Sequence, residues 1–322
     1  MRSVQVVRLE GPSGVEVLEA PDPVRGEDQV LVEVHALGTS WPDLLQSRGH
    51  YQIKPELPFQ LGVDFAGTVL EAPSGSGFSP GDRVACCLPY GGGADLVAVH
   101  PDSVFPLPAG VSFEKAAALP MNYLTAQFAL ATRAQVQAGE TVLVNGAAGG
   151  VGTASLQVAH GYGARTIAVV STEEKAEFVR GLGADHAVLV DGFLGAVKEL
   201  TDGVGVDVVV DVVGGDLMTD SLRSLGPLGR LLVVGFTGGR IPEVKVNRLL
   251  LNNTDVRGVG WGAYAMARPG FMRSQWDDLL PMMESGVVDP PVGTTYPVEE
   301  VSRALEDLDA RRTLGKTVLT LR

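Results

Sequence analysis

The chain has 322 residues, of which 45% are hydrophobic and 20% charged, and this composition excludes a disordered or fibrous protein. Its length favours two domains. The formal net charge of −13 would repel a phosphate backbone, which excludes nucleic acid as the main partner. The two cysteines, Cys86 and Cys87, are adjacent and form neither a disulfide framework nor a zinc ribbon, which favours a reducing cytoplasm. No apolar run is long enough for a membrane span or a signal peptide.

Residues 1 to about 120 consist of short apolar runs separated by Gly and Pro, a pattern typical of β-strands. The predicted strands are SVQVVRLE (3–10), QVLVEVHALG (29–38), FAGTVLEAP (65–73), DRVACCLP (82–89) and DLVAVH (95–100). We therefore expect the first part of the chain to be mostly β.

After Pro120 the pattern changes to strands that alternate with helix-length segments. Such alternation predicts a doubly wound parallel sheet with helices on both faces. The candidate strands are 141–145, 166–170, 186–190, 206–211, 230–235 and 254–260. Helices are expected near 271–285 and 297–312. The last strand, 316–321, is expected to return to the β domain, which makes that domain discontinuous.

A glycine-rich turn lies between the strand 141–145 and an apolar helix. Glycines at 146, 149, 150 and 152 let the backbone approach a pyrophosphate, whose charge the free N–H groups and dipole of the following helix favour. The spacing is G-x-x-G-x-x-G instead of G-x-G-x-x-G, so the flanking strand and helix carry the inference. The alternative is a tight connection that binds nothing.

The end of the second strand of this domain bears on the choice of cofactor. An acidic residue there would bind the ribose 2′-hydroxyl of NAD, but the strand ends in Ser171 and Thr172. Ser171 and Lys175 suit a 2′-phosphate through charge-assisted hydrogen bonds, which favours NADPH. The alternative is a solvated helix start, because Glu173 and Glu174 suit the first turn of a helix.

Five segments together resemble the zeta-crystallin-like quinone oxidoreductases of the medium-chain dehydrogenase/reductase superfamily: 79-SPGDRV-84, 120-PMNYLTA-126, 139-GETVLVNGAAGGVGTASLQVA-159, 181-GLGAD-185 and 205-GVDVVVDVVGG-215. The resemblance spans nearly the whole chain. It implies an α/β protein with a GroES-like β domain over 1–120 and 262–322, and an inserted Rossmann domain over 121–261. It also implies NADPH bound between the domains, and a homodimer.

The resemblance also implies site residues. Those expected at the cofactor are Thr125, Gly146, Ala147, Gly149, Gly150, Val151, Gly152, Ser171, Lys175, Gly235, Phe236, Thr237, Val259, Gly260, Trp261 and Lys316. Those expected at the substrate are Ser40, Tyr51, Asn122 and Trp261. For Tyr51, a packed aromatic is the alternative to a proton donor. For Trp261, the alternative is plain core or a dimer interface.

The chain departs from the family pattern at several positions. In 38-GTSWPDLLQSRGHY-51, Ser40 replaces the usual Asn near the nicotinamide, while Asp43, Gly49 and Tyr51 are retained. Val190 stands where relatives often have a tyrosine at the 2′-phosphate. The positions that hold catalytic zinc in other branches carry Ser40, Val63 and the Met121-Asn122 neighbourhood. We therefore expect no metal, because these residues are not a zinc ligand set.

The activity expected from these features is hydride transfer from NADPH to a quinone or an enone without a metal. Donors near Ser40, Tyr51 and Asn122 would stabilise the negative charge on the acceptor oxygen. One alternative is an enoyl-thioester reductase, whose substrate would need a basic patch beginning at Arg48 and Lys54. Another is a protein that holds NADPH without turnover. The expected partners are a small-molecule substrate and, through the edge strand 254–261, a second copy of the chain.

Overall fold

The computed structural model describes residues 1–322, which pack as two units. The first unit comprises Met1–Met121, Arg268–Asp277 and Pro290–Arg322. The second comprises Asn122–Ala267 and Asp278–Asp289. Compared with the ranges expected from sequence, the second unit extends to Ala267 and includes a further segment near the C-terminus. One helix, α10 (Phe271–Glu284), contributes residues to both units because its contacts change along its length.

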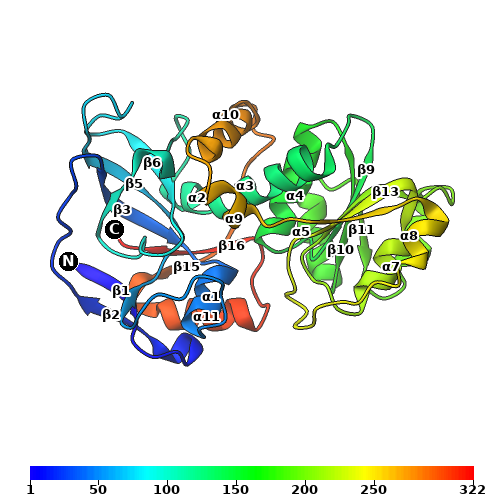
Figure 1. Ribbon diagram of the computed structural model, residues 1–322, viewed down its shortest axis with the longest axis horizontal. Coiled ribbons are helices and arrows are strands. Elements are labelled where there is room, and N and C mark those ends of the chain that lie inside the picture. Colours follow the sequence, from blue (N-terminus) through cyan, green and yellow to red (C-terminus); the bar gives the residue numbers. More distant parts are fainter. The chain divides into compact units, whose positions relative to one another are not determined.

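The first unit is built on a seven-stranded sheet with the order β15-β16-β3-β5-β6-β8, in which β7 also pairs with β3. A second sheet has the order β2-β1-β4. The last strand, β16, pairs antiparallel with β3, and Figure 1 shows these two strands, red and blue, side by side. The strands are β1 (Arg2–Val6), β2 (Val15–Glu19), β3 (Val30–Gly38), β4 (Phe59–Gln60), β5 (Asp64–Glu71), β6 (Arg83–Cys87), β7 (Leu96–Val99), β8 (Val104–Pro106), β15 (Val292–Pro297) and β16 (Lys316–Thr320).

The helices of the first unit are short and pack on these sheets. In α11 the residues Val301, Ala304 and Leu305 are buried, and this helical spacing places one apolar face on the core. The helices are α1 (Trp41–Ser47), α2 (Phe113–Ala117) and α11 (Val301–Asp309), with 3₁₀ turns η1 (Gly11–Gly14), η2 (Pro101–Ser103) and η4 (Val298–Glu300). The start of α3 (Pro120–Gln127) also belongs to this unit.

The second unit is built on a six-stranded parallel sheet with the order β11-β10-β9-β12-β13-β14. Every residue of β9 is buried, as expected for a strand covered on both faces. The chain runs outward from β9 to β11 and then returns to β12 beside β9, so the strand order reverses at this pair. The strands are β9 (Thr141–Asn145), β10 (Arg165–Val170), β11 (His186–Leu189), β12 (Val206–Asp211), β13 (Leu225–Val233) and β14 (Asp255–Gly258).

Helices connect these strands and cover the sheet (Figure 1). The central helix α4 is buried from Gly152 to Ala159, which fits its apolar sequence. The helices are α3, a π-helical segment η3 (Phe128–Ala134), α4 (Gly150–Gly161), α5 (Glu173–Gly181), α6 (Phe193–Leu200), α7 (Leu217–Arg223), α8 (Asn247–Asn252), α9 (Trp261–Met266) and α10.

The predicted doubly wound parallel sheet and its β companion are confirmed. Each of the six strands expected in 141–260 is present, although β13 begins at Leu225 and β14 ends at Gly258. The helix expected over 297–312 is shorter, because Pro297 ends β15 and a 3₁₀ turn precedes α11. None of the helices is both long and apolar enough to cross a membrane.

Candidate cofactor and active site

The glycine turn follows β9 directly and leads into α4. Gly146 has φ +67°, a left-handed conformation that L side chains rarely adopt, so glycine makes this turn possible. A Cβ at Gly152 would lie 2.3 Å from the carbonyl oxygen of Gly146 and 2.7 Å from the Cα of Ala147. Gly152 therefore lets α4 pack tightly on the turn. The Ala147 N–H donates to the carbonyl of Val169, which ties the turn to β10.

Gly149 differs from the other glycines of the turn, because the space beside it is open. A Cβ there would meet only the carbonyl oxygen of Gly146, at an ordinary 3.6 Å. Gly149 is the N-cap of α4 and has no side chain to bond the first N–H groups, those of Gly150, Val151 and Gly152. These donors and the positive end of the helix dipole form an anion-binding cradle. The glycine turn thus fits a pyrophosphate.

Asn122 packs directly against this turn. A Cβ at Gly150 would lie 2.5 Å from Asn122 Nδ2, so the missing side chain makes room for the amide. Asn122 and Thr125, both in α3, are buried in the second unit. Asn122, which was expected at the substrate, therefore lies against the glycine turn.

The carboxyl ends of the two central strands are held together by a buried polar cluster. Asn145 and Asp211 are paired in register on β9 and β12, and Asn145 Nδ2 donates to Asp211 Oδ1 at 3.3 Å. Asp211 also accepts the backbone N–H groups of Val213 and Gly214, both at 3.0 Å. Ligands of open α/β sheets bind outside the carboxyl ends of strands where the strand order reverses, and this is such a position.

The segment expected at the ribose follows β10 at the same edge of the sheet. Ser171 is exposed, and the neighbouring Thr172 caps α5 by accepting the Lys175 N–H at 3.3 Å. Glu173, in the first turn of α5, forms an ion pair with Arg180 at 2.7 Å. Val190 follows β11 and is partly exposed.

The segments expected at the nicotinamide follow β13 and β14. Thr237 Oγ1 donates to the carbonyl of Val212 at 3.0 Å, which holds the segment Gly235–Phe236–Thr237 near the end of β12. Val259 donates to Val233 at 2.9 Å, and Gly260 then precedes α9. Trp261 is 3% exposed, so almost all of its side chain is buried.

The first unit holds the other expected site residues, and two of them, Ser40 and Lys316, form a buried ionic cluster with Asp64. Lys316 Nζ lies 2.5 Å from Asp64 Oδ2 and 2.5 Å from Ser40 Oγ. Ser40 Oγ donates to Asp64 Oδ2 at 3.0 Å. The expected contact of Lys316 with the cofactor stays a prediction, and in the structure its ammonium is bonded to these two side chains.

Asp43 and Tyr51 lie beside this cluster. Asp43 accepts the N–H groups of Ser40 at 2.8 Å and of Gly62 at 3.2 Å, which completes a capping box at the start of α1. Burial raises the pKa of Asp43 to about 7, although Lys316 opposes the shift. Burial, together with Cys87 and Asp43, also raises the pKa of Tyr51 above its usual 10, so the phenol keeps its proton at neutral pH.

The buried Asp43 carboxyl makes stability depend on pH. Because its folded pKa is about 7 and its unfolded pKa about 3.9, the folded state holds a proton that the unfolded chain releases between these values. Its contribution is therefore fully present below about pH 4 and lost as the pH rises through about 7. We expect the Tm of the wild type, relative to that of Asp43→Asn, to fall by several degrees between pH 5 and pH 8. Calorimetry of both proteins measures this, and a constant difference would contradict the assignment.

Comparison with known proteins agrees with this architecture. Residues 26–109 match the family described as "Alcohol dehydrogenase GroES-like domain", and residues 150–285 match "Zinc-binding dehydrogenase". The bovine (Bos taurus) "Quinone oxidoreductase-like protein 2" is 38% identical over 326 residues, covering 100% of this chain and 93% of the relative. The chain belongs to the zinc-free quinone oxidoreductases of the medium-chain dehydrogenase/reductase superfamily.

Solved structures place this quinone oxidoreductase family member in the same fold. A probable oxidoreductase from Mycobacterium abscessus has a TM-score of 0.91 and 42% identity, with 99% of this chain and 98% of that chain covered. The quinone oxidoreductase from Thermus thermophilus, solved alone and with NADPH, has a TM-score of 0.86 and 34% identity over 100% of both chains.

The positions of the zinc ligands in other branches carry no zinc donors in this quinone oxidoreductase family member. Ser40 is bonded to Lys316, Val63 is an apolar core residue, and Met121 offers its backbone N–H to Asp64. Zinc prefers thiolate, imidazole and carboxylate ligands in tetrahedral geometry. No group of three or more His, Cys, Asp or Glu side chains in the chain is arranged to hold a metal ion.

Asp64 was not among the residues expected at the site, yet it is central to the cluster in the first unit. Asp64 is fully buried and begins β5 within the run LGVDFAGTVL. A charge within this mostly apolar run is itself a signal, because buried carboxylates are nearly always paired. That signal does not identify the partner.

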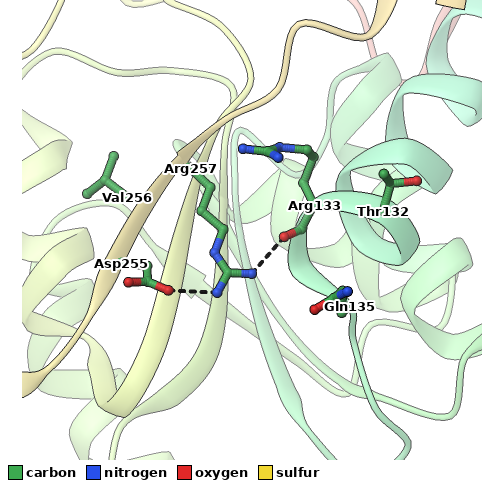
Figure 2. Close-up of a pocket in the computed structure, with 6 residues that line it drawn as sticks. All are labelled: Thr132, Arg133, Gln135, Asp255, Val256 and Arg257. Carbon is green, nitrogen blue, oxygen red and sulfur yellow. Dashed lines mark hydrogen bonds and ion pairs between the residues drawn. The ribbon is translucent and has the colours of Figure 1, made fainter. Parts of the chain in front are cut away.

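A polar surface hollow lies beside the edge strand β14, away from the glycine turn. It is lined by Thr132, Arg133, Gln135, Asp255, Val256 and Arg257. Figure 2 shows Arg257 bonded both to Asp255 and to the carbonyl of Arg133. The bond to Arg133 joins β14 to the end of the π-helical segment, so the hollow belongs to the packing of the sheet edge.

Proposed function

We propose that the protein transfers hydride from NADPH to a quinone or an enone, without a metal. The observation that carries this proposal is the glycine turn, in which each glycine has a separate structural reason. Gly146 makes the turn, Gly149 leaves space beside uncapped N–H groups, and Gly152 allows close helix packing. These are the functions that a dinucleotide-binding turn requires of its glycines.

NADPH is preferred over NADH because the end of β10 carries no acid that would bind a ribose hydroxyl. Ser171 and Lys175 are positioned there instead, and Glu173 is paired with Arg180. A quinone oxidoreductase 34% identical to this chain was solved with NADPH, which supports the same choice here.

Lys175→Ala should weaken NADPH binding by about ten- to a hundredfold. A charge-assisted hydrogen bond to the 2′-phosphate contributes about 1.5–3 kcal/mol, and each 1.4 kcal/mol is about tenfold in affinity. NADH lacks this phosphate, so its affinity should not change. Fluorescence titration of both cofactors measures the effect. Lys198→Ala is the matched control, because Lys198 is an exposed lysine on α6 of the same unit. An unchanged NADPH/NADH ratio would rule out this role for Lys175.

When bound, NADPH supplies the hydride, and the acceptor oxygen gains negative charge as the hydride arrives. Tyr51 is the group of the first unit best suited to donate a hydrogen bond to that oxygen. Its raised pKa keeps the phenol protonated, and its ring is only partly buried. The Ser40 hydroxyl is less suited, because it donates its hydrogen to Asp64.

The enoyl-thioester alternative needs a basic patch for a phosphopantetheine group. Arg48 does not begin such a patch, because its guanidinium forms two bonds with the Asp309 carboxylate, at 3.0 and 2.6 Å. This ion pair neutralises Arg48, which leaves only Lys54 of the two residues considered for that patch. A quinone or an enone needs no such charge.

Steady-state oxidation of NADPH with quinones, enones and enoyl-thioesters tests the proposed substrate class. We expect turnover with quinones or enones and little with enoyl-thioesters. Preference for an enoyl-thioester would contradict the proposed class, and absence of turnover with every acceptor would favour a protein that only holds NADPH.

We also propose a cytoplasmic homodimer. Both cysteines are free thiols, which suits a reducing compartment. The strand β14 lies at the edge of the six-stranded sheet, and an edge strand is a template for pairing with another chain.

A further inference from the structure

The ion pair between Lys316 and Asp64 is almost completely shielded from water. The side chains are 4% and 0% exposed. Burying two charges is costly unless both are fully hydrogen-bonded, and removing one partner leaves an uncompensated charge. The pair therefore depends on the hydrogen bonds that Ser40 and Met121 make with it.

The direction of each hydrogen bond follows from the chemistry of the groups. An ammonium only donates and a carboxylate only accepts. Ser40 Oγ therefore accepts from Lys316 and gives its own hydrogen to Asp64. The Met121 N–H donates to the other oxygen of Asp64 at 2.8 Å. The hydroxyl of Ser40 thus has no hydrogen left for a substrate.

The cluster joins four segments that are distant in sequence. Ser40 follows β3, Asp64 begins β5, Met121 lies in α3 and Lys316 begins β16. A Cβ at Gly38 would lie 2.1 Å from the carbonyl oxygen of Ala117 and 2.7 Å from Lys316 Cε, so glycine at that position makes room for both the backbone and the lysine side chain.

Ser40 is also the N-cap of α1, the helix that precedes Tyr51. Through this cap, the bond from Lys316 fixes the start of the segment that carries the tyrosine. The cluster also lies at the positions expected to hold zinc in other branches, since Ser40 and Met121 are two of them.

We propose that the Lys316 ammonium takes the structural role of a bound metal ion. It holds these segments together and positions α1 and Tyr51. Lys316 is a positioning residue in this view, not a cofactor ligand. The inference rests on the proposed function only for the role of Tyr51. The binding of a cation can be tested separately, because a bound cation raises the Tm whether or not the protein is active.

Chemical rescue of Lys316→Ala is the direct test. The variant should lose about 10 °C in Tm, because it leaves a buried carboxylate unpaired. Its kcat should fall about tenfold or more, because the donor is misplaced. NADPH affinity should not change, because the glycine turn belongs to the other unit. Propylammonium replaces the carbons and the ammonium that the substitution removes, so it should restore both Tm and kcat.

Tetramethylammonium at the same ionic strength is the control, because it has no N–H to donate to Ser40 or Asp64. Failure of propylammonium to raise the Tm above that control would overturn the cation site. Rescue of Tm without rescue of kcat would overturn the positioning role. If the wild type reduces no acceptor, the proposed function fails, and the Tm measurement still decides whether the site takes a cation.

A second pair of variants covers the case in which Lys316→Ala does not fold. Lys316→Met alone should be unstable, whereas Lys316→Met with Asp64→Asn should recover much of the Tm, because no charge is then buried alone. The asparagine still accepts the Met121 N–H. We expect kcat to remain low in the double variant. Recovery of kcat together with Tm would show that Lys316 only neutralises Asp64, which would overturn the proposal.

Discussion

Gly149→Asp should abolish most NADPH binding while leaving the protein as stable as the wild type, or more stable. Aspartate is a preferred N-cap residue, and its charge complements the helix dipole. The structure has room for it, because the nearest atom to an added Cβ is 3.6 Å away. The new carboxylate would occupy the free N–H groups of α4 and repel a pyrophosphate.

The expected loss of affinity is large. Repulsion between unit charges about 4 Å apart is about 4 kcal/mol at the effective dielectric of a protein surface. Each lost charge-assisted hydrogen bond adds about 1.5–3 kcal/mol. NADPH affinity should therefore fall at least about a hundredfold in a fluorescence titration. Gly149→Asn is the matched control, since it fills the same space without the charge and should lose less.

A second comparison separates cofactor binding from folding. Gly152→Ala should lower the Tm even without cofactor, because its Cβ would lie 2.3 Å from the carbonyl oxygen of Gly146. The two glycines should thus give opposite results, with Gly149→Asp stable but unable to bind NADPH. Wild-type NADPH affinity in Gly149→Asp would show that the cofactor does not lie on this turn.

Tyr51→Phe should lower kcat by about a hundred- to a thousandfold, with NADPH affinity unchanged. Removing one hydrogen-bond donor from a developing oxyanion costs about 2.7–4 kcal/mol of transition-state stabilisation. Because the pKa of Tyr51 is raised above 10, the wild-type rate should not fall from loss of this proton until the pH exceeds 10. Stopped-flow oxidation of NADPH across this pH range measures both effects.

Tyr90→Phe provides the matched control for this prediction. Tyr90 lies in the first unit, is 38% exposed and packs edge-on against Phe59. The kcat of Tyr90→Phe should match that of the wild type. An unchanged kcat in Tyr51→Phe would show that Tyr51 is a packed aromatic and that solvent supplies the proton.

The second unit was predictable from sequence because its signals are local. The runs 141–145 and 206–211 are apolar throughout most of their length, and a strand buried on both faces requires this. The glycines follow the first of these runs directly, so strand, turn and helix are visible in one short segment. The π-helical segment Phe128–Ala134 escaped prediction because it departs from the ordinary helical period and ends at Gln135 in a left-handed conformation.

The cluster of the first unit was not predictable, because its members are distant in sequence. Lys316 and Asp64 are 252 residues apart, and they come together because β3 pairs on one side with β16 and on the other with β5, where Asp64 lies. Ser40 and Lys316 were expected at the substrate and the cofactor, and these roles stay predictions. In the structure both side chains are bonded to Asp64, a contact that no local pattern could show.

The fate of the hydrogen at C4 of NADPH tests the central claim most directly. NADPH labelled with deuterium on one face or the other of C4 is oxidised by the wild type with a quinone or an enone, and the NADP⁺ is analysed by mass spectrometry. Enzymatic hydride transfer should remove deuterium completely from one labelled form and leave it completely in the other. Formation of no NADP⁺ with any acceptor, or equal loss of deuterium from both faces, would contradict the proposed reductase.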